Sequence, residues 1–530
     1  MSQLDRIDLG RNGEACSEAE QAPRFRSILG ADAAALPAGV PEPECFHDLN
    51  LDQVVAAVVR GRGEYDLVPL FRTALRDRAT VAFRHDVFRD LEDREFRAQL
   101  GTFAEQMHQT RSYLNLVKEQ RFKYEKERWF LDAAQLYCRT VETLRTSLDG
   151  AEPASEGFRA LRGYLAAYVE SETYTALAAD EQRVRAALGE VRYALKIRGT
   201  RITVGRYEGE PDYSAEVEET FARFRQASAT SHLIRIPDPG SMDHVEAQIV
   251  ERVARLNPAE FQALDRFCID HAGFLDDTIV RLDREVQFYL SYLSYMDTLR
   301  RTGASFCLPT IGDGGESSAT DAFDLALAGK LSEQGAKIVR NSFSLRRPER
   351  IVVVSGPNQG GKTTFSRMFG QIHFLASLGV PVPASEARLF LPDRVFAHFE
   401  RQEDISTLRG KLEDELVRIK EILERATSES VVVVNEIFAS TTLEDAVTLG
   451  LKVMRQVVGI GCVALFVTFV DELASFGRET VSMVATVDPN DPAKRTFTIV
   501  RKPADGRAYA LAIAEKYGLT YEQISERVAE

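Results

Sequence analysis

Apolar residues recur every three or four positions through a proline-free stretch from Asp86 to about Ser147. Phe88, Leu100 and Met107 are among the residues that carry this period. Such spacing places apolar side chains on one face of a helix, so the stretch predicts long helices. Basic residues between positions 118 and 128 alternate with glutamates. That mixture indicates a solvated face, and the alternative interpretation is a binding surface.

Two further helical patterns follow along the chain. One covers residues 158–191, after a break rich in Pro, Gly and Ser, and the other covers 243–301 with an interruption near Asn257-Pro258. Residues 1–45 mix Ala, Pro, Gly and acidic residues without a sustained period, which predicts a flexible arm. The predicted helical region therefore extends over residues 46–302.

Between the helical patterns the period changes to two, over residues 194–206. Apolar residues alternate there with polar and basic ones around Gly199-Thr200, which is typical of a hairpin with a two-residue turn. Pairing Arg198 with Arg201 across the turn places Lys196, Arg198 and Arg201 on one face. These three residues are candidate contacts to a DNA backbone. The alternative, which stays open, is a soluble face of a small β element.

After residue 337 the pattern changes again, because apolar runs such as IVVVS, VVVVNEIF and VALFVTF alternate with helical segments. Continuous apolar runs are expected of strands that are buried on both faces of an α/β sheet. The second part of the chain, residues 303–530, is therefore predicted to be an α/β domain.

Net charge, cysteine spacing and hydropathy limit the classes of function that the protein can have. The 530 residues carry a net charge of −14 and a pI near 5.3, so the whole protein is not built to attract nucleic acid. Any DNA contact must come from a local basic patch. The six cysteines show no metal-ligand spacing and indicate reduced thiols of a cytoplasmic protein. No long apolar run is present, so we expect no membrane span.

The most specific chemical pattern is IVVVSGPNQGGKTT at residues 351–364. An apolar strand ends at Gly356, and four residues separate this glycine from the run Gly361-Lys362-Thr363 before a helix. Strand, glycine loop and helix in this order form a phosphate-binding loop, whose backbone N–H groups and helix N-terminus face a polyphosphate. The alternative is a chance glycine-rich turn before a helix.

This loop predicts a site for ATP and Mg²⁺. Lys362 supplies a positive charge, and the Thr363 hydroxyl can hold Mg²⁺. The buried strand VVVVNE at 431–436 supplies Asn435 at the metal position and Glu436 as general base, unless it is an ordinary core strand. The residues that we assign to nucleotide binding are Gly356, Pro357, Asn358, Gln359, Gly360, Gly361, Lys362, Thr363 and Thr364.

These segments resemble the MutS family of DNA mismatch-repair ATPases. GPNQGGKTT is similar to the family's phosphate loop, NEIFASTTLED to its Walker B strand and the loop that follows, VTFVDEL to its switch segment, and DGRAYALAIAEKYGL to its closing helix. The resemblance covers the chain from about Ser305 to the end and is looser over the helical half.

Three departures from the family's pattern stand out. Asn435 replaces a metal-associated Asp, and Phe469 replaces a switch His. Gly410-Lys411 stands where a Ser-Thr pair opens the signature helix, although that pair could instead align with Ser406-Thr407. In the family this helix completes the partner subunit's nucleotide site. The departures favour slow or DNA-gated hydrolysis.

The resemblance implies an α-helical core and lever over 46–302, then an α/β P-loop NTPase domain of the ABC type over 303–530, without the family's N-terminal mismatch-reading domain. It implies an ATP-dependent DNA-binding protein of DNA repair or recombination, which clamps duplex or branched DNA and forms a homodimer through its ATPase domain. Two alternatives stay open. One is a nucleotide-sensing structural module without turnover, and the other is an ABC-type ATPase that acts on ribosomes or RNA.

Overall fold

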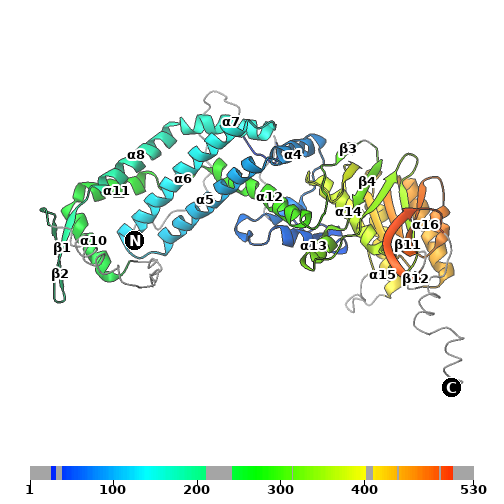
Figure 1. Ribbon diagram of the computed structural model, residues 1–530. Helices are drawn as coiled ribbons and strands as arrows, with labels where there is room; N and C mark the ends of the chain where they lie inside the picture. The colour runs from blue at the N-terminus through cyan, green and yellow to red at the C-terminus, as the bar shows by residue number, and fades with distance from the viewer. Residues whose placement is uncertain are drawn as a thin grey trace, which may run out of the picture. The chain divides into compact units, whose positions relative to one another are not determined.

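A computed structural model describes residues 25–30, 39–210, 242–312, 314–400, 410–438, 441–488 and 491–504. The chain forms two compact units (Figure 1). Unit 1 comprises Phe25 and the described residues within Asp93–Pro153 and Phe158–Asp283, and unit 2 those within Arg26–Glu92, Ala154–Gly157 and Arg284–Glu530. These units do not coincide with the predicted domains 46–302 and 303–530, which stay a prediction about function.

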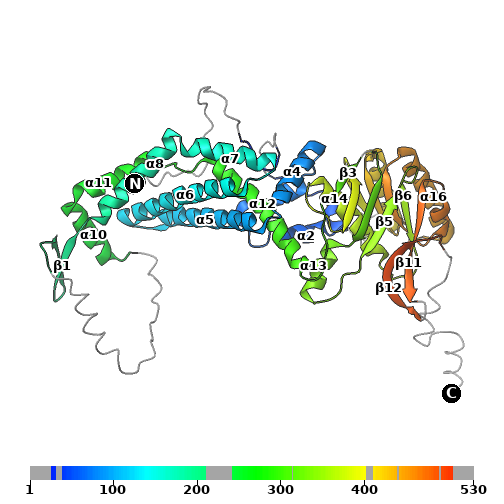
Figure 2. The same cartoon turned by 45° about the horizontal axis from the view of Figure 1, so that its top comes forward.

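Unit 1 is helical apart from one hairpin, as the apolar period of the sequence predicts. Its two longest helices, α5 (Arg94–Glu119) and α6 (Lys123–Ala151), lie side by side (Figures 1 and 2). The ring of Phe274 packs edge-on at 5.4 Å from both Phe130 and Tyr137 in the core. The remaining helices are α7 (Glu156–Val169), α8 (Glu172–Gly189), α10 (His244–Leu256), α11 (Pro258–Asp270) and α12 (Asp277–Arg300), and α12 continues into unit 2.

The hairpin consists of β1 (Tyr193–Arg198) and β2 (Arg201–Arg206), which pair antiparallel. Arg198 lies opposite Arg201 and Lys196 lies opposite Thr203, so the register is the one that the alternating pattern predicts. Because paired residues share a face, Lys196, Arg198 and Arg201 lie on the same face of the hairpin.

Unit 2 contains two β-sheets. The larger sheet has the strand order β12-β11-β6-β10-β9-β8, in which all neighbouring pairs are parallel except β11 with β12. Its strands are β6 (Ile351–Ser355), β8 (Val395–His398), β9 (Val431–Asn435), β10 (Val463–Val467), β11 (Thr480–Asp488) and β12 (Asp491–Arg501). Every residue of β6, β9 and β10 is buried, which confirms the prediction from their apolar runs.

Helices cover both faces of this sheet. Helix α14 (Lys362–Ser377) is buried along most of its length and contacts β8, β9 and β10. The opposite face packs on α15 (Lys411–Arg425) and α16 (Leu443–Ile460), through side chains such as Ile419 and Met454. Figure 2 shows α14 and α16 on opposite sides of the strands. This arrangement explains why the central strands are apolar up to their last residues, Ser355 in β6 and Asn435 in β9.

The smaller sheet has the order β3-β7-β4-β5. Its strands are β3 (Thr310–Gly312), β4 (Ser317–Ala322), β5 (Asn341–Leu345) and β7 (Glu386–Phe390). Between β4 and β5 lies the short helix α13 (Leu325–Glu333), whose N-cap Asp324 accepts hydrogen bonds from two amides of the first turn. The other helices of unit 2 are α1 (Cys45–Asp48), α2 (Leu51–Val58), α3 (Val68–Arg72), α4 (Arg78–Asp90), and the 3₁₀ turns η2 (Gly63–Tyr65) and η3 (Asp471–Ser475).

Residues 25–30 differ from the flexible arm predicted for 1–45. Ile28 is fully buried, its amide donates to Glu285 at 2.9 Å, and its carbonyl accepts from the Tyr289 hydroxyl at 2.6 Å. These anchors come from α12 and cannot be seen in a local pattern, since Glu285 is 257 residues away in the sequence. Residues 1–24 and 31–38 lie outside the described part of the chain.

Two other expectations concern membrane-spanning helices and the state of the cysteines. None of the described helices is long and apolar enough to cross a membrane. Among the described residues, Cys45, Cys138, Cys268, Cys307 and Cys462 are all free thiols.

Candidate nucleotide-binding site

The glycine loop joins β6 to α14 in a conformation that requires glycine. Gly356 has φ 116°, and a Cβ at this position would lie 3.0 Å from the backbone of Ala485. Gly361, the N-cap of α14, has φ 92°. Both torsions belong to the region that residues with a Cβ rarely adopt. The backbone of β11 therefore packs directly against the turn of the loop.

Lys362 is the first residue of α14 and lies inside the loop. Its side chain is 5% exposed, and its ammonium donates to the carbonyls of Gly356 at 3.0 Å and Pro357 at 3.2 Å. Burial lowers the pKa of Lys362, while the Glu436 carboxylate acts in the opposite direction and the Arg495 cation adds to the lowering. The ammonium thus donates its hydrogen bonds to neutral carbonyls, and phosphate oxygens would be stronger acceptors at this place.

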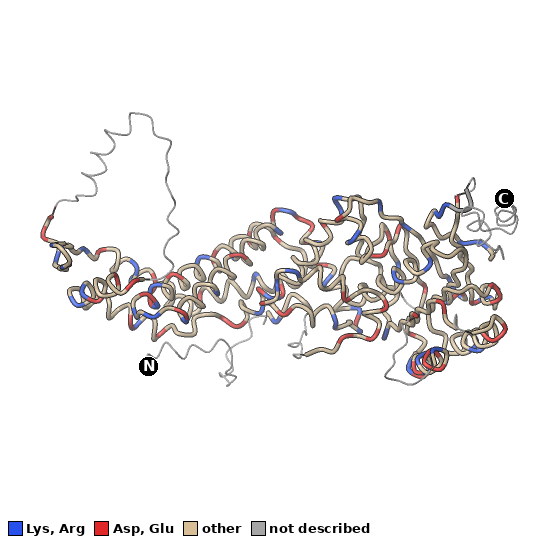
Figure 3. Tube along the Cα trace, turned by 90° about the horizontal axis from the view of Figure 1, so that it is seen from below, with Lys and Arg blue, Asp and Glu red and all other residues tan. Residues whose placement is uncertain are grey.

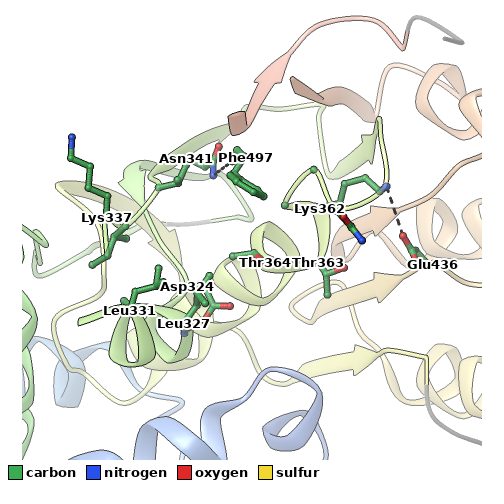
Figure 4. A pocket seen from close by; sticks show the side chains of 16 residues that line it. Asp324, Leu327, Leu331, Lys337, Asn341, Lys362, Thr363, Thr364, Glu436 and Phe497 are labelled. Carbon is green, nitrogen blue, oxygen red and sulfur yellow. Dashed lines mark hydrogen bonds and ion pairs between the residues drawn. The ribbon is translucent and has the colours of Figure 1, made fainter. Parts of the chain in front are cut away.

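The end of β9 brings the two predicted residues of the second segment to the loop. Glu436 has φ 54°, its amide donates to the Val467 carbonyl at 2.9 Å, and its carboxylate lies 3.8 Å from the Lys362 ammonium. Figure 4 shows this pair at one end of the pocket. A left-handed backbone at Glu436 turns the chain sharply at the strand end. The carboxylate therefore points to the loop instead of into the sheet.

Asn435 is buried below the loop. Its side-chain oxygen accepts a hydrogen bond from Ser366 of α14 at 3.5 Å, one turn after Thr363. The Asn435 amide and the Thr363 hydroxyl are both oxygen ligands, which suit Mg²⁺ when phosphate oxygens complete the coordination. The donor set therefore fits Mg²⁺ that arrives with a nucleotide. Among the described residues, no group of three or more His, Cys, Asp or Glu side chains could hold a metal alone.

A cavity of about 420 Å³ opens beside the loop. One wall consists of loop residues 359–364 with Glu436, and the opposite wall is formed by α13 and the segment after it. The apolar residues of that second wall include Leu327, Leu331 and Val339. A polar end at Lys362 and an apolar side chamber would suit a ligand that carries both phosphates and a ring.

Phe497 of β12 lines the cavity, and the sequence gives no signal for it. It has φ 58°, and its carbonyl accepts from the Asn341 side chain at 3.2 Å. The Phe497 backbone also lies 3.5 Å from the position of a Cβ on Gly361. Figure 4 shows Asn341 and Phe497 beside the loop, whereas the Lys337 side chain extends away from it.

The predicted start of the signature helix has two alignments, and the described residues include only one of them. Helix α15 begins at Lys411 after Gly410, but the Lys411 ammonium pairs with Glu400. Its first turn also carries Glu413 and Asp414, which disfavour an anion at the helix N-terminus. The alternative position, Ser406-Thr407, lies outside the described residues. Phe469, the residue at the predicted switch position, is 50% exposed just after β10.

The predicted DNA-binding residues belong to unit 1 and are not part of this cavity. Lys196, Arg198 and Arg201 are all exposed, and Lys196 forms an ion pair with Glu210 at 3.7 Å. The opposite face of the hairpin exposes Leu195 and Ile197. An exposed basic face with an apolar reverse side is consistent with either interpretation of the hairpin.

Two of the five basic residues at positions 118–128 form ion pairs with neighbouring acids. Lys123 contacts Asp265 at 2.6 Å, and Arg128 lies 3.6 Å from Asp132. Figure 3 shows basic and acidic residues interspersed along these helices. This pairing supports the interpretation as a mixed solvated face.

Comparison with known proteins matches residues 352–528 to MutS domain V. Endonuclease MutS2 of Thermus thermophilus is 34% identical over 197 residues, which are 36% of this chain and 26% of the relative. The DNA mismatch repair protein MutS of Erythrobacter litoralis is 26% identical over 392 residues, or 72% of this chain and 44% of the relative. MutS of Thermotoga maritima is 29% identical over 185 residues, which are 34% of this chain and 23% of the relative. The chain thus spans from 23% to 44% of the length of these relatives.

Proposed function

We propose, on the premise that the chain is a MutS-family protein, that it is an ATP-dependent DNA-binding protein with a P-loop NTPase domain of the ABC type. The relatives named DNA mismatch repair proteins, together with MutS2, favour a role in DNA repair or recombination. The observation that carries the proposal is the convergence of Lys362 and Glu436 at one end of a cavity with an apolar side chamber.

In the proposed site the polyphosphate lies along the loop, residues 356–364, and the ring occupies the chamber beside α13 and Phe497. Lys362 transfers its hydrogen bonds from the Gly356 and Pro357 carbonyls to phosphate oxygens, which are stronger acceptors. Mg²⁺, held by the Thr363 hydroxyl with Asn435 behind it, would neutralise charge on the phosphates.

Glu436 is the proposed general base. Its carboxylate is 34% exposed, so water can reach it, and it lies beside the Lys362 end of the loop, where the terminal phosphate would be. A positioned base accepts the proton of the attacking water. Because Asn435 is a neutral amide where a carboxylate would hold the metal more strongly, we propose slow hydrolysis.

Two partners complete the proposal. In the proposed site this chain would contact the nucleotide from one side only, so we propose a homodimer in which the partner's α15 region approaches the other side. DNA is proposed to contact the basic hairpin face of unit 1, through Lys196, Arg198 and Arg201. ATP binding and hydrolysis would then control how the protein clamps duplex or branched DNA.

A nucleotide sensor without turnover is the second candidate. The buried Asn435, which already accepts a hydrogen bond from Ser366, and the exposed Phe469 at the switch position favour it. Steady-state ATPase rates without nucleic acid, with duplex DNA and with RNA test the proposal. We expect a slow rate that duplex DNA changes more than RNA does. No turnover in any of the three would favour the sensor, and a response to RNA alone would favour an ATPase that acts on ribosomes or RNA.

A further inference from the structure

A second cavity of about 390 Å³ lies in unit 2 between α2, α12 and α13, which Figure 2 shows next to one another. Its volume is within the range of small-ligand sites, roughly 300 to 1,000 Å³. It shares no lining residue with the nucleotide cavity. Leu327, Ala328 and Leu331 of α13 line the nucleotide cavity, whereas Gly329 and Lys330 line this one. A ligand in one cavity therefore leaves the other open.

The charge of this second cavity contrasts with that of the protein. The chain has a net charge of −14, yet the cavity is lined by three cationic side chains and one carboxylate, namely Arg60, Arg62, Lys330 and Glu333. Like charges that share a groove raise the free energy of the protein unless an anion joins them.

The cationic side chains of the cavity still have N–H groups free to donate hydrogen bonds to a ligand. Within the described residues, the side chains of Arg60 and Lys330 have neither an ion pair nor a hydrogen bond. Arg62 uses its Nε to donate to Gln287 at 3.0 Å, so its side chain is oriented. Ser294 on α12 adds a hydroxyl, whereas Thr298 already donates to the Ser294 carbonyl. Guanidinium and ammonium groups arranged in this way recognise phosphoryl oxygens well.

The floor of the cavity is fixed by a close contact between α12 and α13. The Tyr295 hydroxyl donates to the Leu325 carbonyl at 3.2 Å and lies 2.8 Å from the position of a Cβ on Gly329. Only glycine permits this approach without displacement of the tyrosine. The spacing between Lys330, the cation of α13, and the polar residues of α12 is thereby set before any ligand arrives.

We propose that this cavity is a second anion site, which binds a phosphoryl group through Arg60, Arg62 and Lys330. The group has two sources, a free polyphosphate or the phosphate backbone of nucleic acid, and both present the same oxygens. The site does not depend on the glycine loop, so it stands or falls separately from the proposed ATP binding.

The test uses the full chain with Lys362→Ala, which disables the proposed nucleotide loop, and two probes, inorganic tripolyphosphate and a short DNA duplex. Calorimetry should show that Arg60→Gln with Lys330→Gln weakens binding of at least one probe tenfold or more. Lys452→Gln with Arg455→Gln, an exposed pair on α16, is the matched control and should change nothing. Loss for tripolyphosphate identifies a free polyphosphate, and loss for the duplex alone identifies backbone phosphate.

A variant that should strengthen binding instead of weakening it makes the test more stringent. Glu333→Gln removes the one carboxylate of the cavity and should strengthen binding of the same probe. Unchanged affinity of both probes in the double variant would overturn the proposal. The cations would then serve only to complement the carboxyl ends of α2 and α13.

Discussion

The Lys362 ammonium and the Glu436 carboxylate lie 3.8 Å apart at the junction of the glycine loop and the end of β9. Lys362 is the first residue of α14, and Glu436 follows the last residue of β9. Because β9 and β6 both pair with β10 in parallel, their carboxyl ends reach the same edge of the sheet. The sheet topology thus brings together an ammonium and a carboxylate, the two groups that we propose bind phosphate and accept the proton of water.

Glu436→Gln separates binding from turnover. The amide keeps the size of the side chain but cannot accept the proton of the attacking water, so we expect turnover to fall by about 10²- to 10⁴-fold. ATP affinity should be unchanged or higher, because Lys362 loses a competing anion. Single-turnover hydrolysis and equilibrium binding of ATP measure the two effects. A variant that turns over ATP like the wild type would remove Glu436 from its proposed role.

ATP should strengthen dimerisation. The nucleotide cavity is open on one side, and a second chain would cover the phosphates there. Light scattering of the Glu436→Gln variant with and without ATP measures the mass, since this variant holds the nucleotide. A mass that stays that of one chain with ATP bound contradicts the proposed homodimer.

The hairpin should contribute to DNA affinity through phosphate contacts. Each lost contact flattens the dependence of log affinity on log salt by about one, so Lys196→Glu, Arg198→Glu and Arg201→Glu together should reduce the slope by roughly three. Binding of a DNA duplex at several salt concentrations checks this. The control replaces Arg183, Arg252 and Arg255, which are exposed on α8 and α10, by Glu. Equal slopes in the hairpin variant and the wild type would exclude the hairpin as a DNA contact.

Glu127 should make unit 1 less stable as the pH rises. Burial in α6, and then the neighbouring Asp265, raise the pKa of Glu127 to about 8, while Lys123 acts in the opposite direction. Because its pKa is raised in the folded state, the protonated Glu127 stabilises the fold fully below its ordinary pKa of 4.5. This stabilisation is lost as the pH rises through about 8.

The variant Glu127→Gln stays neutral and should escape that loss. Between pH 4.5 and 8, the free energy of unfolding of this variant should rise relative to that of the wild type by about 1.4 kcal/mol or more. A difference of about 1.4 kcal/mol corresponds to a tenfold change in proton affinity. Urea unfolding across this pH range is the measurement. Glu119→Gln, at an exposed position of α5, is the control. Parallel pH profiles for wild type and Glu127→Gln would show that Glu127 is ionised in the folded protein.

The sequence predicts those parts of the structure that depend on neighbours along the chain. The loop from Gly356 to Thr363, the three buried strands and the register of Arg198 with Arg201 all follow from local spacing. Phe497 and Asn341 were missed, because 156 residues separate these two members of one cavity wall. Contacts of that kind arise from the order of strands in the sheets, which no local period reveals.

The same reason explains the error at residues 25–30. Their composition resembles that of a loose segment, but Ser27 and Ile28 bind the Glu285 carboxylate of α12. A buried carboxylate stays in the core only when it is satisfied by donors. The segment is therefore ordered by a requirement of α12, which cannot be read from the segment itself.

Equilibrium binding of ATP in the presence of Mg²⁺ to the wild type and to Lys362→Ala tests the central claim most directly. Lys452→Ala, an exposed position on α16, is the control for loss of a positive charge from unit 2. We predict that Lys362→Ala abolishes measurable binding and that Lys452→Ala binds like the wild type. Retention of wild-type affinity by Lys362→Ala would show that the loop from Gly356 to Thr364 does not bind the nucleotide.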